Sequence, residues 1–77
     1  MARIEVLVEE ARERVGFHDP AKATYSAYEI GGHKMLQVDT YGRSTREIPG
    51  KISQSIQLDE RSGRQLFDIL ADHFGFK

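Results

Sequence analysis

Apolar residues in the first part of the chain recur at the spacing of one helix face: Ile4, Leu7, Val8, Ala11 and Val15. Steps of three and four residues predict an amphipathic helix over about residues 3–15, with Gly16 and Pro20 behind it as stop signals. A short strand at residues 4–8 is the alternative, because Val6 lies off the apolar stripe and three of those five residues are β-branched.

The middle of the chain changes to the two-residue period of strands. Residues 24–30 and 33–41 flank Gly31 and Gly32, and a Gly-Gly pair suits a two-residue hairpin turn with positive φ at both positions. A hairpin with Ile30 opposite His33 gives one face that is the better core candidate, formed by Tyr25, Ala27, Leu36 and Val38. The mixed opposite face suits a surface half covered by a partner or ligand and carries Ser26, Tyr28, Ile30, Met35, Gln37, Asp39 and Tyr41.

A third run alternates cleanly over residues 52–58, and an apolar helical stripe follows with Leu66, Phe67, Leu70 and Phe74. Asp59 is a candidate helix cap, Ser62 with Gln65 offers a slightly later start, and Gly75 is the stop signal. Residues 42–50 read as a loop, with a short edge strand possible at residues 46–48.

These elements predict one α+β domain over residues 1–77. We expect an N-terminal helix and its connection in residues 1–20. A three- to four-stranded antiparallel meander sheet and a C-terminal amphipathic helix should follow in residues 23–74.

The chain has 77 residues and no cysteine. A domain of this size buries only about 60% of its unfolded surface, and without disulfides such a domain often gains burial by pairing with a copy of itself, so we expect a homodimer. The absence of cysteine fits a reducing compartment, and no apolar run has the length of a signal peptide or membrane span. We therefore expect a cytoplasmic protein.

The formal net charge is −1, but positive charge is concentrated locally at Arg43, Arg46 and Lys51. Such cations hold phosphate, and an aromatic ring beside them can stack on an unpaired base. Tyr41 adjoins this group, and Lys34 and Tyr28 extend the surface along the hairpin. These six residues are the candidate nucleic-acid-binding set, and an ordinary polar loop is the alternative interpretation.

Catalytic signatures are missing from the sequence. The histidines His18, His33 and His73 lack metal-site spacing, and there is no cysteine nucleophile, Gly-rich phosphate loop or G-x-S-x-G motif. We therefore predict no enzyme, no metal and no cofactor. Acidic clusters at residues 9–13 and 59–72 keep a nuclease or nicking activity as a third hypothesis, although solvated helix faces explain them more simply.

The order strand pair, G-R-x-x-R-x-x-P-G-K, ISQSIQLD and leucine-containing helix resembles the transcriptional positive-cofactor-four family over about residues 24–74. The resemblance implies a curved antiparallel sheet, a C-terminal helix, a dimer built through both, and binding of single-stranded DNA with little sequence preference. The family's basic residues correspond here to Arg43, Arg46 and Lys51. Some phage and mobile-element proteins, including a few anti-CRISPR proteins, look like versions of the same fold.

Two functional hypotheses follow. The first is a dimer that binds single-stranded or distorted DNA through the basic loop and a sheet face. The alternative is a protein-interaction module, such as a phage or mobile-element inhibitor or accessory protein resembling anti-CRISPR proteins. The near-neutral net charge, the acidic first segment and the partly apolar second sheet face favour this alternative.

Overall fold

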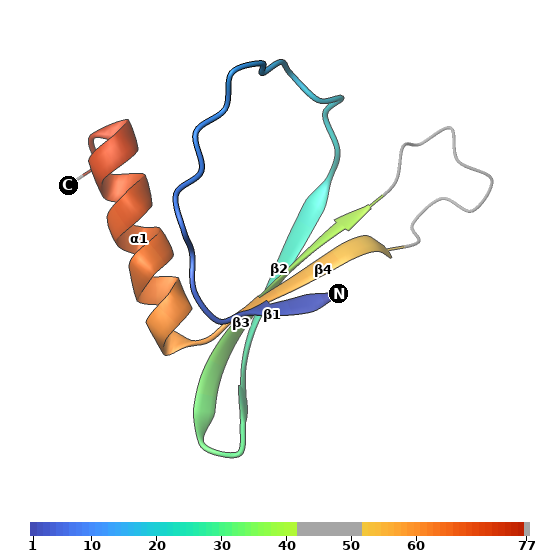
Figure 1. Ribbon diagram of the computed structural model, residues 1–77. Helices are drawn as coiled ribbons and strands as arrows, with labels where there is room; N and C mark the ends of the chain where they lie inside the picture. Colours follow the sequence, from blue (N-terminus) through green and yellow to red (C-terminus); the bar gives the residue numbers. More distant parts are fainter. Residues whose placement is uncertain (42–51, 77) are drawn as a thin grey trace.

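A computed structural model describes residues 1–41 and 52–76, in which one sheet carries one helix on one of its faces (Figure 1). The strands are β1 (Ala2–Ile4), β2 (Ala23–Ile30), β3 (His33–Tyr41) and β4 (Ile52–Leu58), and the helix is α1 (Glu60–Phe74). The strand order is β1-β4-β3-β2, in which β1 runs parallel to β4 and the other neighbours are antiparallel.

The central hairpin confirms the predicted turn and register. Ile30 pairs with His33, and both turn glycines have positive φ, 54° at Gly31 and 82° at Gly32. Residues with a Cβ rarely adopt such angles, so the Gly-Gly pair fixes where the two strands reverse. β4 then pairs with β3, and a shift in register occurs between Thr40 and Tyr41.

The predicted N-terminal helix is wrong. Ala2–Ile4 forms β1, which pairs with the last residues of β4, and residues 5–22 contain neither helix nor strand. An isolated helix of about 13 residues is marginal unless its apolar face is packed. Val8 and Val15, which belong to the predicted stripe, are exposed. The alternative strand at residues 4–8 is also wrong, since β1 ends at Ile4.

The parallel pairing of β1 overturns the predicted fold class in a second respect. The sheet is mixed, and β1 adds to the free edge of β4 from a distant point in the sequence. That edge offers unpaired backbone groups to any extended segment that reaches it, which a local sequence pattern does not reveal. The proposed edge strand at residues 46–48 lies outside the described residues.

Beyond β1 the chain is attached to α1 by a side chain. The backbone N–H of Leu7 donates to Gln65 Oε1 at 2.9 Å, and Gln65 Nε2 donates to the Leu7 carbonyl at 2.6 Å. One amide thus satisfies both backbone groups of Leu7, as a neighbouring strand would. Residues 8–22, which we call the arm, are all exposed and lead to β2, where the Lys22 carbonyl accepts from the Tyr41 N–H at 3.2 Å.

Helix α1 begins where the first predicted cap places it. Asp59 accepts from the Ser62 N–H at 2.9 Å, and Ser62 Oγ accepts from the Asp59 N–H at 3.1 Å, which completes a capping box. The Ser62 N–H and, at 3.1 Å, the Ser62 hydroxyl both donate to the Asp59 carboxylate, and these two bonds lower the pKa of Asp59. Because Ser62 lies inside the first turn, the later start is wrong. Gly75, with φ of 73°, ends the helix as predicted. The helix is too short and too polar to cross a membrane.

The predicted core face is the one that α1 covers, although the cover is thin. Ala27, Leu36 and Leu58 face Leu66 and other residues of the helix stripe. Leu58, with 5% of its surface exposed, is the single buried hydrophobic residue in the described part of the chain. The other large apolar residues of this face and of α1 remain half-buried or exposed.

Candidate nucleic-acid interface

The side of the sheet away from α1 carries a continuous group of polar side chains from three neighbouring strands. Alternation along each strand and the observed register place eight residues there, which we call the polar face: Thr24, Ser26, Tyr28, Gln37, Asp39, Tyr41, Ser55 and Gln57. The single helix of the described residues lies on the opposite side, so no helix packs over this face (Figure 1).

Five of these side chains form one chain of hydrogen bonds. Gln57 Nε2 donates to Tyr28 Oη at 2.7 Å, and Tyr28 Oη donates to Gln37 Oε1 at 2.6 Å. Gln37 Nε2 then donates to Asp39 Oδ1 at 2.9 Å, and Ser55 Oγ donates to the same oxygen at 2.6 Å. Every donor in the chain points toward the carboxylate, so the bonds polarise one another and fix the side chains that make them.

Tyr28 lies across the sheet as a result. It belongs to β2, whereas Gln57 belongs to β4, and β3 runs between them. Neighbouring strands are about 4.8 Å apart, so the hydroxyl has to lean over β3 to reach a side chain of β4. The side chain therefore extends over β3, and the residue is half-buried. A planar group held in this way can stack on another planar group.

Tyr41 is anchored on the same face. Its hydroxyl lies 3.0 Å from Thr24 Oγ1 on β2, and its backbone N–H is bonded to Lys22 at the end of the arm. Both tyrosines of the predicted nucleic-acid-binding set thus lie on the polar face, with hydroxyl groups tied to neighbouring strands.

Asp39 supplies a negative charge beneath this face. Asp39 is buried, with 8% of its surface exposed. Burial alone would raise the pKa of its carboxyl group, but the hydrogen bond from Ser55 and the weaker effect of the bond from Gln37 lower it. It is therefore ionised at neutral pH. The charged carboxylate accepts hydrogen bonds from Gln37 and Ser55, and through Gln37 it holds the side chain of Tyr28 in place.

Asp39 should make the stability of the protein depend on acid. Its pKa is lowered in the folded state from an ordinary 3.8, so its stabilising effect is complete above that pH and is lost as pH falls through the lowered value. Wild type should be more stable than Asp39→Asn near pH 6. We expect this difference in the free energy of unfolding, measured with urea, to shrink as the pH falls below 3.8. A constant difference at every pH would contradict this role. Asp59 titrates in both proteins and cancels in the comparison.

Of the other predicted residues, Lys34 belongs to the described part of the chain and is not on the polar face. Lys34 lies opposite Glu29 in the register of β2 and β3. It lines a groove between α1 and the strands, on the other side of the sheet from the polar face. Arg43, Arg46 and Lys51 lie outside the described residues. The chain enters and leaves their segment at Tyr41 and Ile52, which pair with each other where β3 ends and β4 begins.

Two features of the face were missed from the sequence. The hydrogen-bond network around Asp39 joins side chains of three strands. The sequence indicated it only through the polar residues at alternate positions of each strand. Arg3, assigned to the predicted helix, instead lies in β1 opposite Gln57 and forms an exposed ion pair with Asp59 at 3.5 Å. Such an exposed pair contributes little to the stability of the fold.

Other chemistry has less support in the geometry. Within residues 1–41 and 52–76, no three histidine, aspartate or glutamate side chains come together as a metal-binding group.

Comparison with known proteins gives no relative for this chain: no family model, no curated protein and no solved structure matches it. The resemblance to the positive-cofactor-four family stays a prediction from the sequence, and the polar face has to be interpreted from its own geometry.

Proposed function

We propose that this protein binds single-stranded or distorted nucleic acid across the polar face, with bases stacking on Tyr28 and Tyr41. The observation that carries the proposal is the position of Tyr28, whose hydroxyl is hydrogen-bonded to Gln37 on β3 and to Gln57 on β4, so that the side chain extends across the sheet. Sheets that present aromatic rings in this way are a common means of holding unpaired bases.

Phosphate contacts would come from Arg43, Arg46 and Lys51, which follow Tyr41 in the sequence. The amide of Gln57 has hydrogen-bonding capacity left after its bond to Tyr28 and can meet a base edge. Stacking works with any base, so we expect little sequence preference and a preference for single strands over duplex DNA.

A titration against a single-stranded oligonucleotide and the matching duplex, at about 50 and 200 mM salt, tests the proposal. Binding to the single strand should weaken steeply at the higher salt, because cations that neutralise phosphates release counterions. The combined variant Arg43→Ala, Arg46→Ala, Lys51→Ala should bind more weakly and lose most of this salt dependence. Absence of binding at low salt, or an unchanged salt response in the variant, would refute the proposal.

A protein-interaction module is the second candidate, and the exposed apolar stripe of α1 favours it, with Phe67, Leu70 and Phe74 open to solvent. An inhibitor or accessory protein of phage or mobile-element origin would use such a surface. It predicts flat nucleic-acid titrations at low salt, together with capture of one specific protein that Phe67→Glu abolishes.

We assign no catalytic step to either face. Supercoiled plasmid incubated with the protein and magnesium should stay intact, and nicking that a chelator stops would overturn this assignment. We also place the protein in the cytoplasm, which the absence of cysteine from the sequence supports.

A further inference from the structure

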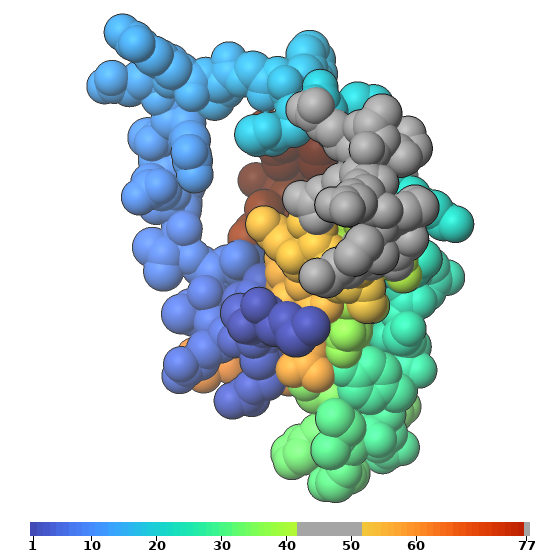
Figure 2. Space-filling view, turned by 90° about the vertical axis from the view of Figure 1, so that its right-hand side faces the viewer, coloured from blue at the N-terminus to red at the C-terminus, as the bar shows by residue number. Residues whose placement is uncertain are grey.

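Strand β2 lies at one edge of the sheet, and in the described part of the chain it pairs with β3 alone. All of its residues except Thr24 and Tyr28 are exposed. In Figure 2 its blue-green atoms form the right-hand margin of the molecule, with no other coloured segment beyond them. A strand in this position presents a row of unpaired backbone N–H and C=O groups.

The register shows which residues of β2 offer those groups. In an antiparallel pair, alternate residues direct both backbone groups to the partner strand, and the residues between them direct theirs away. The two-residue turn bonds Ile30 to His33, and the Lys22 carbonyl accepts from the Tyr41 N–H at 3.2 Å. Even-numbered residues therefore bond to β3. The residues whose backbone groups point outward are Ala23, Tyr25, Ala27 and Glu29.

This outer edge lacks the features that commonly protect exposed edges, which are proline, lysine and bulges. The sequence of β2, ATYSAYEI, contains neither proline nor lysine, and its pairing with β3 is continuous from Ala23 to Ile30. The opposite edge of the sheet already holds an extended segment, because β1 pairs there with β4. The outer edge of β2 is therefore open to an added strand.

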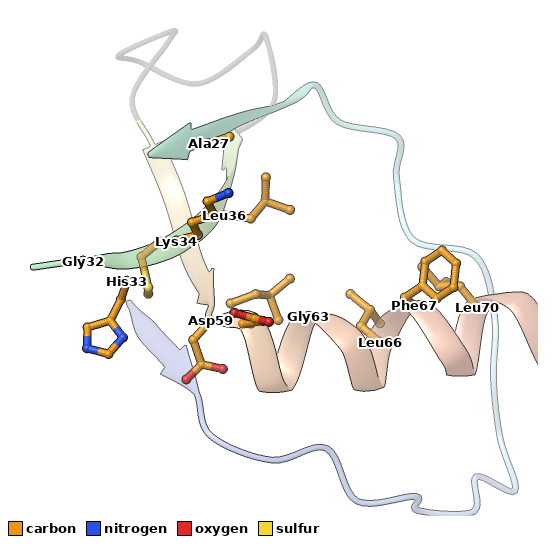
Figure 3. A pocket seen from close by; sticks show the side chains of 13 residues that line it. Ala27, Gly32, His33, Lys34, Leu36, Asp59, Gly63, Leu66, Phe67 and Leu70 are labelled. Atoms are coloured by element: carbon orange, nitrogen blue, oxygen red, sulfur yellow. The ribbon is translucent and has the colours of Figure 1, made fainter. Parts of the chain in front are cut away.

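The side chains beside this edge favour a strand that alternates apolar and polar residues. Tyr25 and Ala27 lie on the α1 side of the sheet, and Ala27 borders the groove between α1 and the strands, opposite Leu66 (Figure 3). Apolar side chains of an added strand would be covered on this side. Ser26 and Tyr28 lie on the polar face, where polar side chains of the added strand would remain in contact with water.

Glu29 adds a preference for positive charge. It is the single charged residue of β2 and is exposed. Lys34 lies opposite it on β3, yet no ion pair joins Glu29 to another residue of the described ranges. A cation directly across from Glu29 on an added strand would form a favourable cross-strand pair.

A second copy of β2 is a poorer occupant of this edge. In the antiparallel register that uses all four outward residues, Tyr25 lies opposite Ala27 and Glu29 lies opposite Ala23. Neither the ring nor the carboxylate then gains a complementary neighbour. A segment of a different protein can place a β-branched side chain opposite Tyr25 and a cation opposite Glu29.

We propose that the outer edge of β2 binds an extended segment of another protein as an added antiparallel strand. The segment alternates apolar and polar residues and carries a basic residue opposite Glu29. Main-chain hydrogen bonds supply the affinity, and the alternating side chains supply the specificity. This binding does not depend on what the polar face binds.

The synthetic peptide KTITVTV, acetylated and amidated at its ends, is the probe. Its lysine is designed to face Glu29, its isoleucine Ala27 and its first valine Tyr25. We expect binding with a dissociation constant below about 1 mM, measured by calorimetry. Hydrogen exchange of the Tyr25 and Ala27 amides should slow when the peptide binds, because they gain acceptors. The amides of Ser26 and Tyr28, which already bond to β3, should change little.

Peptide backbone methylation provides a matched control that leaves the protein unchanged. Methyl groups on the nitrogens of the isoleucine and the first valine, which face β2, should weaken binding by about tenfold or more. Methyl groups on the nitrogens of the second and third threonines, which face away, should leave the affinity nearly unchanged. Equal weakening by both modifications would overturn the proposal, and so would absence of binding up to about 1 mM peptide.

A charge exchange tests the role of Glu29. The peptide ETITVTV should bind wild type about 1.5- to 5-fold more weakly than KTITVTV, and Glu29→Lys should reverse this preference. An unchanged preference in the variant would contradict the proposed register. Slow exchange at Tyr25 and Ala27 without peptide, increasing with protein concentration, would assign the edge to a second copy of the chain and overturn the proposal.

Discussion

Leu58→Ala is expected to lower the free energy of unfolding by about 2–5 kcal/mol, the range for removing a buried leucine side chain. Small domains have only about 5–15 kcal/mol in total. Leu58 ends β4, pairs with both Leu36 and Ile4, and immediately precedes the helix cap, so it joins three strands to α1. Because it is 5% exposed, the surrounding side chains can fill the vacated space only by moving together.

Urea unfolding followed by circular dichroism, at one protein concentration for all variants, measures this loss. Ile30→Ala is the matched control, because Ile30 is an aliphatic strand residue that is mostly exposed. It should cost well under half as much. Equal losses at the two positions would mean that Leu58 is not the centre of the packing.

Tyr28→Ala is expected to have the largest effect on nucleic-acid binding. Loss of one base–aromatic stack removes about 1–3 kcal/mol of binding free energy, which is roughly a 5- to 150-fold rise in the dissociation constant. Tyr28→Phe should fall between this variant and wild type, because it keeps the ring but loses the bonds to Gln37 and Gln57 that orient it.

Tyr25→Ala provides the control for that experiment. Tyr25 lies on the same strand three residues earlier, is 76% exposed and belongs to the opposite face of the sheet. Its loss should leave the affinity for a single-stranded oligonucleotide unchanged. If Tyr25→Ala weakened binding as much as Tyr28→Ala, the polar face would not be the binding surface.

Features set by short-range chemistry were predictable from the sequence. Gly31 and Gly32 specify a turn that fixes the hairpin register. Asp59 accepts a hydrogen bond from a backbone N–H at the start of α1, and Gly75 ends the helix in a left-handed conformation. In each case the decisive groups are within a few residues of one another, so no knowledge of the fold was needed.

The N-terminal segment was not predictable, because its partners are distant in sequence. Its apolar spacing fits a helix, yet Ala2–Ile4 pairs with β4 and Leu7 is bonded to Gln65, fifty-eight residues away. Tertiary partners of this kind override local periodicity. The network around Asp39 was hidden for a similar reason, since it depends on side-chain bonds between strands, such as the one that joins Tyr28 and Gln57 across 29 positions of the chain.

We expect nucleic acid to contact one face of the sheet only, and glutamine side chains lie on both sides of it. Gln37 and Gln57 hold Tyr28 on the polar face, whereas Gln65 holds Leu7 beside α1. Their side-chain amide protons can be followed separately by nuclear magnetic resonance during titration with a single-stranded oligonucleotide. We predict that the amide signals of Gln37 and Gln57 shift with increasing oligonucleotide while that of Gln65 stays in place. A shift at Gln65 with no change at Gln37 and Gln57 would contradict the assignment of nucleic-acid binding to the polar face.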